Sequence, residues 1–457
     1  MADVRTALAG VVGAEHVLAG DEVPPEYGRD ESLGVAPQRP GFVARPADTG
    51  QVAGLLRVAA AHGLPVTARG SGTGLSGAAV PRPGGLVVSF ERMDRIVEID
   101  PDGQVAVVQP GVTLAGLGRA AAGHGLVYPV FPGEGGASIG GTVATNAGGM
   151  HAVKEGVTRH HVLGLEAVLA TGEVIRTGGR YVKTSTGYDL TQLIVGSEGT
   201  LALVTEATLR LRPRLPHRAG ALAPFRDTAA VTAAVPRLTG GGLDPLVLEY
   251  VDVLAMAAIT GNAGLDLGVP PDVRDAAGAY LLVILENRSA ERLDEDVQAL
   301  GEELAELGAA DMYVLTGDRL RALVTAREQA FWAARNAGAT AIVDAVVPRA
   351  ALAPFFAAVP AIAGRHGALI GGCGHAGDGN VHLSVFQPDA DALAPLMDEL
   401  LAAAAELGGT ISGEHGIGRE KARHFRALED PAKVELMRRI KTSFDPDGIL
   451  NPGVLFG

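Results

Sequence analysis

The chain has 457 residues, of which 47% are hydrophobic, so it can bury a core in each of two or three domains, and a disordered chain is excluded. A formal net charge of -14 with no run of Lys or Arg argues against a nucleic-acid partner. The single cysteine, Cys373, excludes an intramolecular disulfide and fits a reducing cytoplasm. No signal peptide or transmembrane segment is predicted, so any membrane contact is expected to be peripheral, at the inner face.

The first half of the chain is predicted to be an α+β domain over residues 37–215, after a leading segment of residues 1–36. Asp48 is placed to cap a helix that ends at Gly63, and a second helix is predicted over 113–122. Strand patterns cover 66–69, 86–90, 96–100, 105–109, 162–170, 173–177 and 204–211. Residues 131–150 are mostly small and show hardly any helix or strand signal.

Pro213 and Pro216 end the last of these strands, so the domain boundary is placed there. In the second domain, residues 216–457, longer helices alternate with strands. The predicted strands cover 246–249, 280–286, 341–347, 368–371 and 381–386, and the predicted helices cover 290–307, 320–335, 352–366 and 391–407. No internal repeat is visible in the sequence.

A glycine-rich loop follows the strand at 66–69. Residues 72–77 match the dinucleotide-binding pattern G-x-G-x-x-G, but Pro81 and Pro83 exclude the helix that this pattern requires. The backbone N–H groups of residues 69–74 could instead form an anion nest suited to a pyrophosphate. A glycine-rich hairpin loop with no ligand is the alternative.

Two further segments of this kind cover residues 132–149 and 195–201. In order and spacing, the three segments resemble the FAD-binding domain of the vanillyl-alcohol-oxidase and p-cresol-methylhydroxylase type. The resemblance implies an α+β fold, with a two-subdomain FAD-binding domain followed by a ferredoxin-like α+β substrate (cap) domain. No histidine stands in the first loop, where some relatives attach FAD covalently, so a non-covalent FAD is predicted.

The resemblance assigns FAD contacts to residues of the three segments and to one residue near the C-terminus. They are Arg69, Gly70, Ser71, Gly72, Thr73, Gly74, Leu75, Ser76, Pro132, Gly133, Gly136, Ser138, Gly141, Thr142, Thr145, Asn146, Gly149, Glu198, Gly199, Val204 and Asn451.

Histidines and a glutamate gather in two glycine-flanked loops of the second domain. His375 and His382 stand on either side of a Gly/Asp turn, and Glu414 and His415 are neighbours further on. Two His and one Glu suit a divalent metal, expected to be zinc, with positions left open for substrate, and the third His is left for proton transfer. The alternative is a set of polar residues satisfied within their loops.

These loops resemble the C-terminal domain of FAD-linked oxidases such as D-lactate dehydrogenases, glycolate oxidase flavoprotein subunits and D-2-hydroxyglutarate dehydrogenases. The resemblance implies that His375, His382 and Glu414 bind the metal and that His415 acts on the substrate. It also implies that Arg335 pairs with the substrate carboxylate. Ile342 stands where some relatives have a lysine for a distal acid group, so a small monocarboxylate is expected rather than a dicarboxylate.

The predicted function is FAD-dependent oxidation of a small D-2-hydroxy acid, of the D-lactate or glycolate type, to the 2-oxo acid. A cation would hold the acid and lower its hydroxyl pKa, so that a neutral histidine can remove the proton. The electron acceptor is open among a quinone, a cytochrome, a protein and oxygen, and a homodimer is one expected assembly. Two alternatives are a non-catalytic FAD-binding subunit of a glycolate oxidase-like complex and a non-redox flavoprotein of the alkylglycerone-phosphate synthase type.

Overall fold

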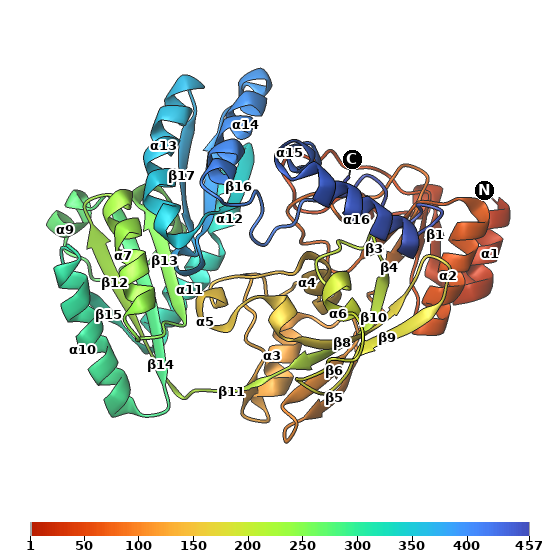
Figure 1. The fold of residues 1–457 in the computed structure, drawn as a ribbon, viewed down its shortest axis with the longest axis horizontal. Helices are drawn as coiled ribbons and strands as arrows, with labels where there is room; N and C mark the ends of the chain where they lie inside the picture. Colours follow the sequence, from red (N-terminus) through yellow and green to blue (C-terminus); the bar gives the residue numbers. More distant parts are fainter. Residues whose placement is uncertain (1, 457) are drawn as a thin grey trace.

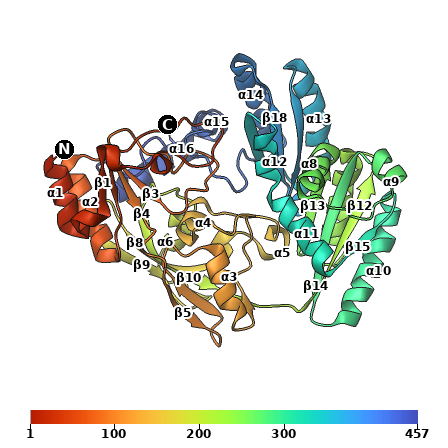
Figure 2. The same cartoon turned by 180° about the vertical axis from the view of Figure 1, so that it is seen from behind.

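The computed structural model describes residues 2–456, which form two lobes (Figure 1). One lobe contains the N-terminal half together with the C-terminal helices, and the other contains the segment from about residue 217 to residue 410 (Figure 2). The chain passes between the lobes at β11 (Arg212–Pro213), whose edge position beside β7 (Leu126–Val127) accommodates a proline.

The N-terminal lobe has two sheets, each with its own core. The first has strand order β1-β2-β4-β3, and α1 (Ala2–Val12) and α2 (Thr49–His62) pack against it. Its strands are β1 (Val17–Ala19), β2 (Phe42–Ala44), β3 (Val66–Arg69) and β4 (Leu86–Ser89). As predicted, the Asp48 side chain caps α2 by accepting from Gln51 N, and Gly63 ends the helix at a φ of 60°.

The second sheet is antiparallel, with order β5-β6-β10-β8-β9. Its strands are β5 (Ile96–Asp100), β6 (Val105–Val108), β8 (Val162–Val168), β9 (Val174–Gly178) and β10 (Leu203–Arg210). The helices α3 (Leu114–Ala122), α4 (Ile139–Thr145) and α6 (Leu190–Ile194) bury side chains in its core, and the short α5 (Ala152–Glu155) reaches the other lobe. The helix α4 was not expected, because its seven residues include two glycines and only the Ser138 cap announces it.

The other lobe, called the cap lobe, is built on one seven-stranded antiparallel sheet of order β15-β12-β14-β13-β17-β18-β16, the cap sheet. It consists of two halves with the same element order. The first half contains β12 (His217–Phe225), α7 (Thr228–Gly240), β13 (Val247–Asp252), β14 (Ala279–Asn287), α10 (Ala290–Glu306) and β15 (Tyr313–Leu315). The second contains β16 (Ala341–Val346), α13 (Leu352–Arg365), β17 (Leu369–Gly374), β18 (Asn380–Phe386) and α14 (Ala390–Glu406), with Thr410 bridged to Val346 in place of a fourth strand. Each half is thus ferredoxin-like, a repeat of structure that the sequence did not show.

Helices cover both faces of this sheet. Four of them, α7, α10, α13 and α14, share the larger core on one face. On the other face lie α8 (Val253–Ala263), α11 (Gly317–Glu328) and α12 (Ala330–Asn336), with α9 (Pro271–Ala276) at the edge. The single helix predicted over 320–335 is therefore two helices, which meet at Gln329.

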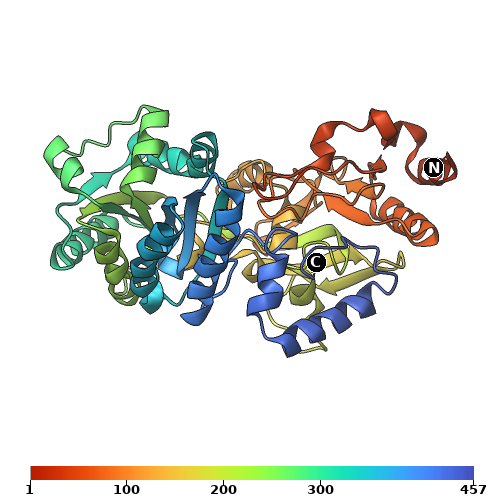
Figure 3. The ribbon, with the colours of Figure 1, turned by 90° about the horizontal axis from the view of Figure 1, so that it is seen from above.

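After residue 410 the chain returns to the N-terminal lobe, where α15 (Ala422–Leu428) and α16 (Pro431–Phe444) lie beside it (Figure 3). Val66 N donates to Ile449 O, and Asn451 N donates to Val66 O, each over 2.7 Å, so Leu450 extends the first sheet beside β3. The Lys441 ammonium donates to Thr200 O over 2.7 Å. The C-terminal segment that packs against the glycine-rich loops therefore includes α16 as well as the last residues of the chain.

Glu198 holds the returning segment. Its buried carboxylate accepts from Ile417 N over 2.9 Å and from Gly418 N over 2.8 Å, through separate oxygens. Because Gln offers only one acceptor oxygen, Glu198→Gln sets an amide N–H against a backbone N–H. We expect it to lower the free energy of unfolding by about 1–3 kcal/mol, measured by urea denaturation. The matched change Glu295→Gln, on the exposed surface of α10, should leave that free energy within about 0.5 kcal/mol, and equal losses in both variants would contradict the assignment.

Candidate active site

The three glycine-rich segments line one cleft, together with Asn451 from the returning C-terminal segment. The backbone N–H groups of Gly72, Thr73, Gly74 and Leu75 donate to no other group of the described protein, so they are available to a ligand. Predicted FAD contacts that line the cleft are Gly70, Ser71, Gly72, Thr73, Gly74, Leu75, Pro132, Ser138, Gly141, Thr142, Thr145, Glu198, Gly199 and Asn451. Free donors in a cleft of this kind fit an anionic group such as a pyrophosphate.

The remaining predicted contacts do not line this cleft, and most of them support it from behind. Arg69 donates to Arg29 O over 2.6 Å, and Ser76 Oγ lies 2.9 Å from both His415 O and Gly416 O. Asn146 ends α4 in a left-handed conformation, and Val204 is buried in the core of the second sheet. Gly136 O accepts from Ser71 Oγ, Gly133 lines the neighbouring cavity, and Gly149 lies where a Cβ would be 1.8 Å from Phe131 O.

The predicted metal ligands meet in space. His375 follows β17, His382 lies on β18, and Glu414 belongs to the loop after Thr410. Glu414 Oε1 is 3.3 Å from His375 Nε2 and 3.2 Å from His382 Nε2, and one ligating atom from each of the three residues lies within 4.8 Å of the others. His382 Nε2 and Glu414 Oε2 are buried without a hydrogen-bond partner. Buried, unpartnered nitrogen and oxygen donors that converge in this way fit a divalent cation such as zinc.

Asp344, on β16, organises the loop that carries Glu414 and His415. Its buried carboxylate accepts from Ser412 Oγ over 2.8 Å, from His415 N over 3.0 Å and from Lys421 Nζ over 3.1 Å. It also accepts from Asn380 Nδ2 over 2.9 Å, and its Oδ2 is 3.8 Å from His415 Nδ1. Asp344 with His382 and His415 forms a second, overlapping group of potential ligands.

A buried ion pair positions His375 from behind. Glu249, on β13, contacts His375 Nδ1 through one carboxylate oxygen, and its other oxygen lies 2.7 Å from Arg327 Nη2. The carboxylate fixes the ring so that Nε2 faces Glu414, as outer carboxylates do for histidine ligands of metals. Burial raises the pKa of Glu249, but the charges of His375 and Arg327 outweigh burial and bring the pKa to about 2.

The electrostatic environment differs among the site residues. Burial, opposed by Asp344, lowers the pKa of His415 to about 4, so its imidazole is neutral at neutral pH. Burial alone would lower the pKa of His375, but the carboxylates of Glu249 and Glu414 raise it well above its usual value. The pKa of Asp344 lies well below its usual value because protonated His415, present at the low pH where Asp344 titrates, and the Lys421 ammonium outweigh burial.

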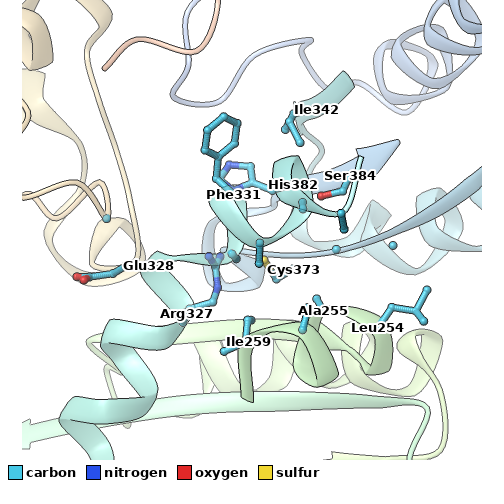
Figure 4. A pocket seen from close by; sticks show the side chains of 18 of the residues that line it. Leu254, Ala255, Ile259, Arg327, Glu328, Phe331, Ile342, Cys373, His382 and Ser384 are labelled. Atoms are coloured by element: carbon cyan, nitrogen blue, oxygen red, sulfur yellow. The ribbon is translucent and has the colours of Figure 1, made fainter. Parts of the chain in front are cut away.

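A second cavity, called the cap cavity, lies on the face of the cap sheet that α8, α11 and α12 cover (Figure 4). Arg327, His375 and His382 lie along its wall. It adjoins the glycine-lined cleft, since Leu75, Pro132, Glu414 and His415 line both spaces. The histidine and glutamate cluster therefore stands where a group bound by the N-terminal lobe and a molecule in the cap cavity would meet.

Arg335 is not brought to this cavity. Its guanidinium pairs with Glu31, 2.5 Å away, and lies 5.3 Å above the Trp332 ring. The helix break at Gln329 gives α12 its own orientation, so Arg335 does not continue the face of α11 that carries Arg327. Asp344, Glu249, Arg327 and Lys421 were not expected at the site from the sequence. The signal for Asp344 was a single carboxylate in an apolar strand, and for Glu249 a carboxylate inside the apolar run of residues 246–251.

Comparison with known proteins gives the class. Residues 40–178 match the family described as FAD binding domain, and residues 214–455 match FAD linked oxidases, C-terminal domain. The chain belongs to the FAD-linked oxidase family. The fold is the expected α+β arrangement. The structure of p-cresol methylhydroxylase with bound substrate aligns with this chain at a TM-score of 0.76 and 18% identity, and the alignment covers all of this chain and 96% of the methylhydroxylase chain. An alkyldihydroxyacetonephosphate synthase aligns with a TM-score of 0.76 at 16% identity, over 99% and 84%.

Relatives found by sequence show which members of this family the chain is similar to. An uncharacterized FAD-linked oxidoreductase of Mycobacterium tuberculosis is 56% identical over the full length of both chains. D-lactate dehydrogenase of Anaerostipes hadrus is 35% identical over 97% of this chain and 95% of its own length. Glycolate oxidase subunit GlcD of Bacillus subtilis is 37% identical over 91% and 89%. Across residues 2–456, no helix combines the length and the apolar character that crossing a membrane requires.

The ligand set predicts a measurable loss of metal. In His382→Ala one of the three converging donors is removed, so we expect the metal content of the purified protein, measured by inductively coupled plasma mass spectrometry, to fall at least about tenfold. The exposed His124→Ala change should retain the metal content of the parent. Equal metal content in parent and His382→Ala would exclude His382 as a ligand.

Proposed function

We propose that this protein oxidises a 2-hydroxy acid, of the D configuration where C2 is chiral, to the 2-oxo acid, using non-covalently bound FAD. D-lactate and glycolate belong to this class of substrate. The observation that carries the proposal is the position of His415, which lines both the glycine-rich cleft and the cap cavity and stands beside the three converging ligands.

FAD, when bound, would accept the C2 hydrogen of the substrate with its two electrons. His375, His382 and Glu414 would hold a divalent cation that supplies positive charge near the substrate oxygens. His415 takes the hydroxyl proton, and the Asp344 carboxylate, 3.8 Å from His415 Nδ1, stabilises the imidazolium that results. Leu75 and Pro132 place apolar groups on the boundary between the two spaces, which favours the release of water when the substrate binds there.

The protein supplies a fixed geometry for this reaction. Hydrogen bonds from Ser412, His415 N and Lys421 to Asp344 hold the loop that bears the base, and the Glu249 carboxylate holds His375 from the opposite side. Because both carboxylates are buried and multiply bonded, the ligands and the base are oriented before substrate arrives.

Removal of the base tests the reaction. In His415→Ala the cleft residues that face FAD are otherwise unchanged, so we expect normal flavin content but anaerobic flavin reduction by a D-2-hydroxy acid slowed by about 10²- to 10⁴-fold. Stopped-flow absorbance of the flavin measures this rate, and His124→Ala serves as control. An unchanged rate would refute the role of His415. A parent protein that binds flavin but is reduced by no 2-hydroxy acid would refute the proposed function and favour a scaffold or non-redox role.

A further inference from the structure

The floor of the cap cavity changes from polar to apolar along three neighbouring strands. The pairing of β16, β18 and β17 places Asp344, His382 and Cys373 in one row across the sheet. The next row on the same face contains Ile342, Ser384 and Gly371, and the row after it contains Phe386 and Leu369. Because two residues along a strand span about 7 Å, the third row lies about 13 Å from the metal ligands.

The helices above this floor continue the same trend. The cavity residues of α8 are Leu254, Ala255, Ala258 and Ile259, and those of α12 are Ala330, Phe331, Ala333 and Ala334. Figure 4 shows Phe331 on one side and Ala255 and Ile259 on the other, with Cys373, His382 and Ser384 between them. The short side chains of the α12 alanines leave room for a ligand. Gly371 allows close packing of Leu254, whose Cδ1 would lie 3.2 Å from a Cβ at that position. Leu254 and Leu369 are 50% and 55% exposed, so the apolar end opens to solvent.

The charged residues that line the cavity do not suit a substrate with a second carboxylate. Among the described residues that line it, Arg327 is the only Arg or Lys, and Glu249 already neutralises its guanidinium at 2.7 Å. Glu328 adds a carboxylate, and not a cation, to the lining of the cavity, near the loop of Gly133. In the second row, opposite Ser384, stands the aliphatic Ile342. A dicarboxylate would therefore bury its distal charge against apolar groups, without a partner.

We propose that the 2-hydroxy acid carries an unbranched apolar side chain of several carbons, which lies along the apolar rows while its carboxylate and hydroxyl remain at the histidine and glutamate cluster. The inference rests on the proposed function and goes beyond it by naming the substrate class. A two- or three-carbon acid such as glycolate or D-lactate leaves the second and third rows uncovered. Each methylene of the substrate that is buried there should raise the second-order rate constant of flavin reduction about fourfold.

A chain-length series tests the inference on the purified flavoprotein. Anaerobic flavin reduction is followed with glycolate, D-lactate, D-2-hydroxybutyrate, D-2-hydroxyhexanoate, D-2-hydroxyoctanoate and D-2-hydroxyglutarate. We expect the second-order rate constant to rise with chain length, by at least about 50-fold from D-lactate to D-2-hydroxyhexanoate, with D-2-hydroxyglutarate below both hexanoate and octanoate derivatives. Reduction that is fastest with glycolate, D-lactate or D-2-hydroxyglutarate overturns the inference but leaves the proposed function standing. Reduction by none of the acids overturns both.

Two variants locate the side chain of the substrate. Ala334→Phe fills the cavity beyond the ligands, so the ratio of the rate constants for D-2-hydroxyoctanoate and D-lactate should fall at least tenfold. The matched Ala361→Phe change, on the exposed surface of α13, should keep the parent ratio. Ile342→Lys places a cation in the second row and should shift preference toward D-2-hydroxyglutarate over D-2-hydroxyhexanoate by at least tenfold. Parent-like ratios in both cavity variants, with normal flavin content, would place the side chain elsewhere and overturn the inference.

Discussion

The site depends on the buried carboxylate of Asp344. It accepts hydrogen bonds from the loop of residues 412–415, from Asn380 on the next strand, and from the Lys421 ammonium. A buried carboxylate with fewer partners would be costly, because each hydrogen bond to a charged group contributes about 1.5–3 kcal/mol. The charge therefore requires the loop to keep one conformation, and in that conformation Glu414 and His415 face His375, which follows β17, and His382 on β18.

The two lobes contribute different chemistry to the same boundary. The N-terminal lobe offers backbone N–H groups and small side chains, which suit the phosphates and flat rings of a dinucleotide. The cap lobe offers imidazoles, carboxylates and an apolar channel. Neither lobe holds all of these groups, and the loop of Glu414 and His415 is placed between them because Glu198 and Ser76, from the N-terminal lobe, bind its backbone.

Much of the fold could be predicted from the sequence, because alternating apolar residues and side-chain caps act locally. Asp48 before α2 and the apolar run of β8 are examples, and the pairing of His375, His382 and Glu414 followed from their glycine-flanked motifs. The break at Gln329 carried no local signal, so Arg335 was expected at the site and lies against Glu31 instead. Asp344, Glu249 and Arg327 act through partners at least 36 positions away in sequence, which only the strand pairing and helix packing bring near.

The chain crosses between the lobes twice, once at residues 213–217 and again after Thr410, and its end adds Leu450 to the first sheet. The pairing of Leu450 with Val66, and the hydrogen bonds that Ile417 N and Gly418 N donate to Glu198, tie the returning segment to the N-terminal lobe. The cavity in the other lobe is open to solvent at Leu254 and Leu369, so a molecule that enters there meets apolar side chains before it reaches the histidine and glutamate cluster.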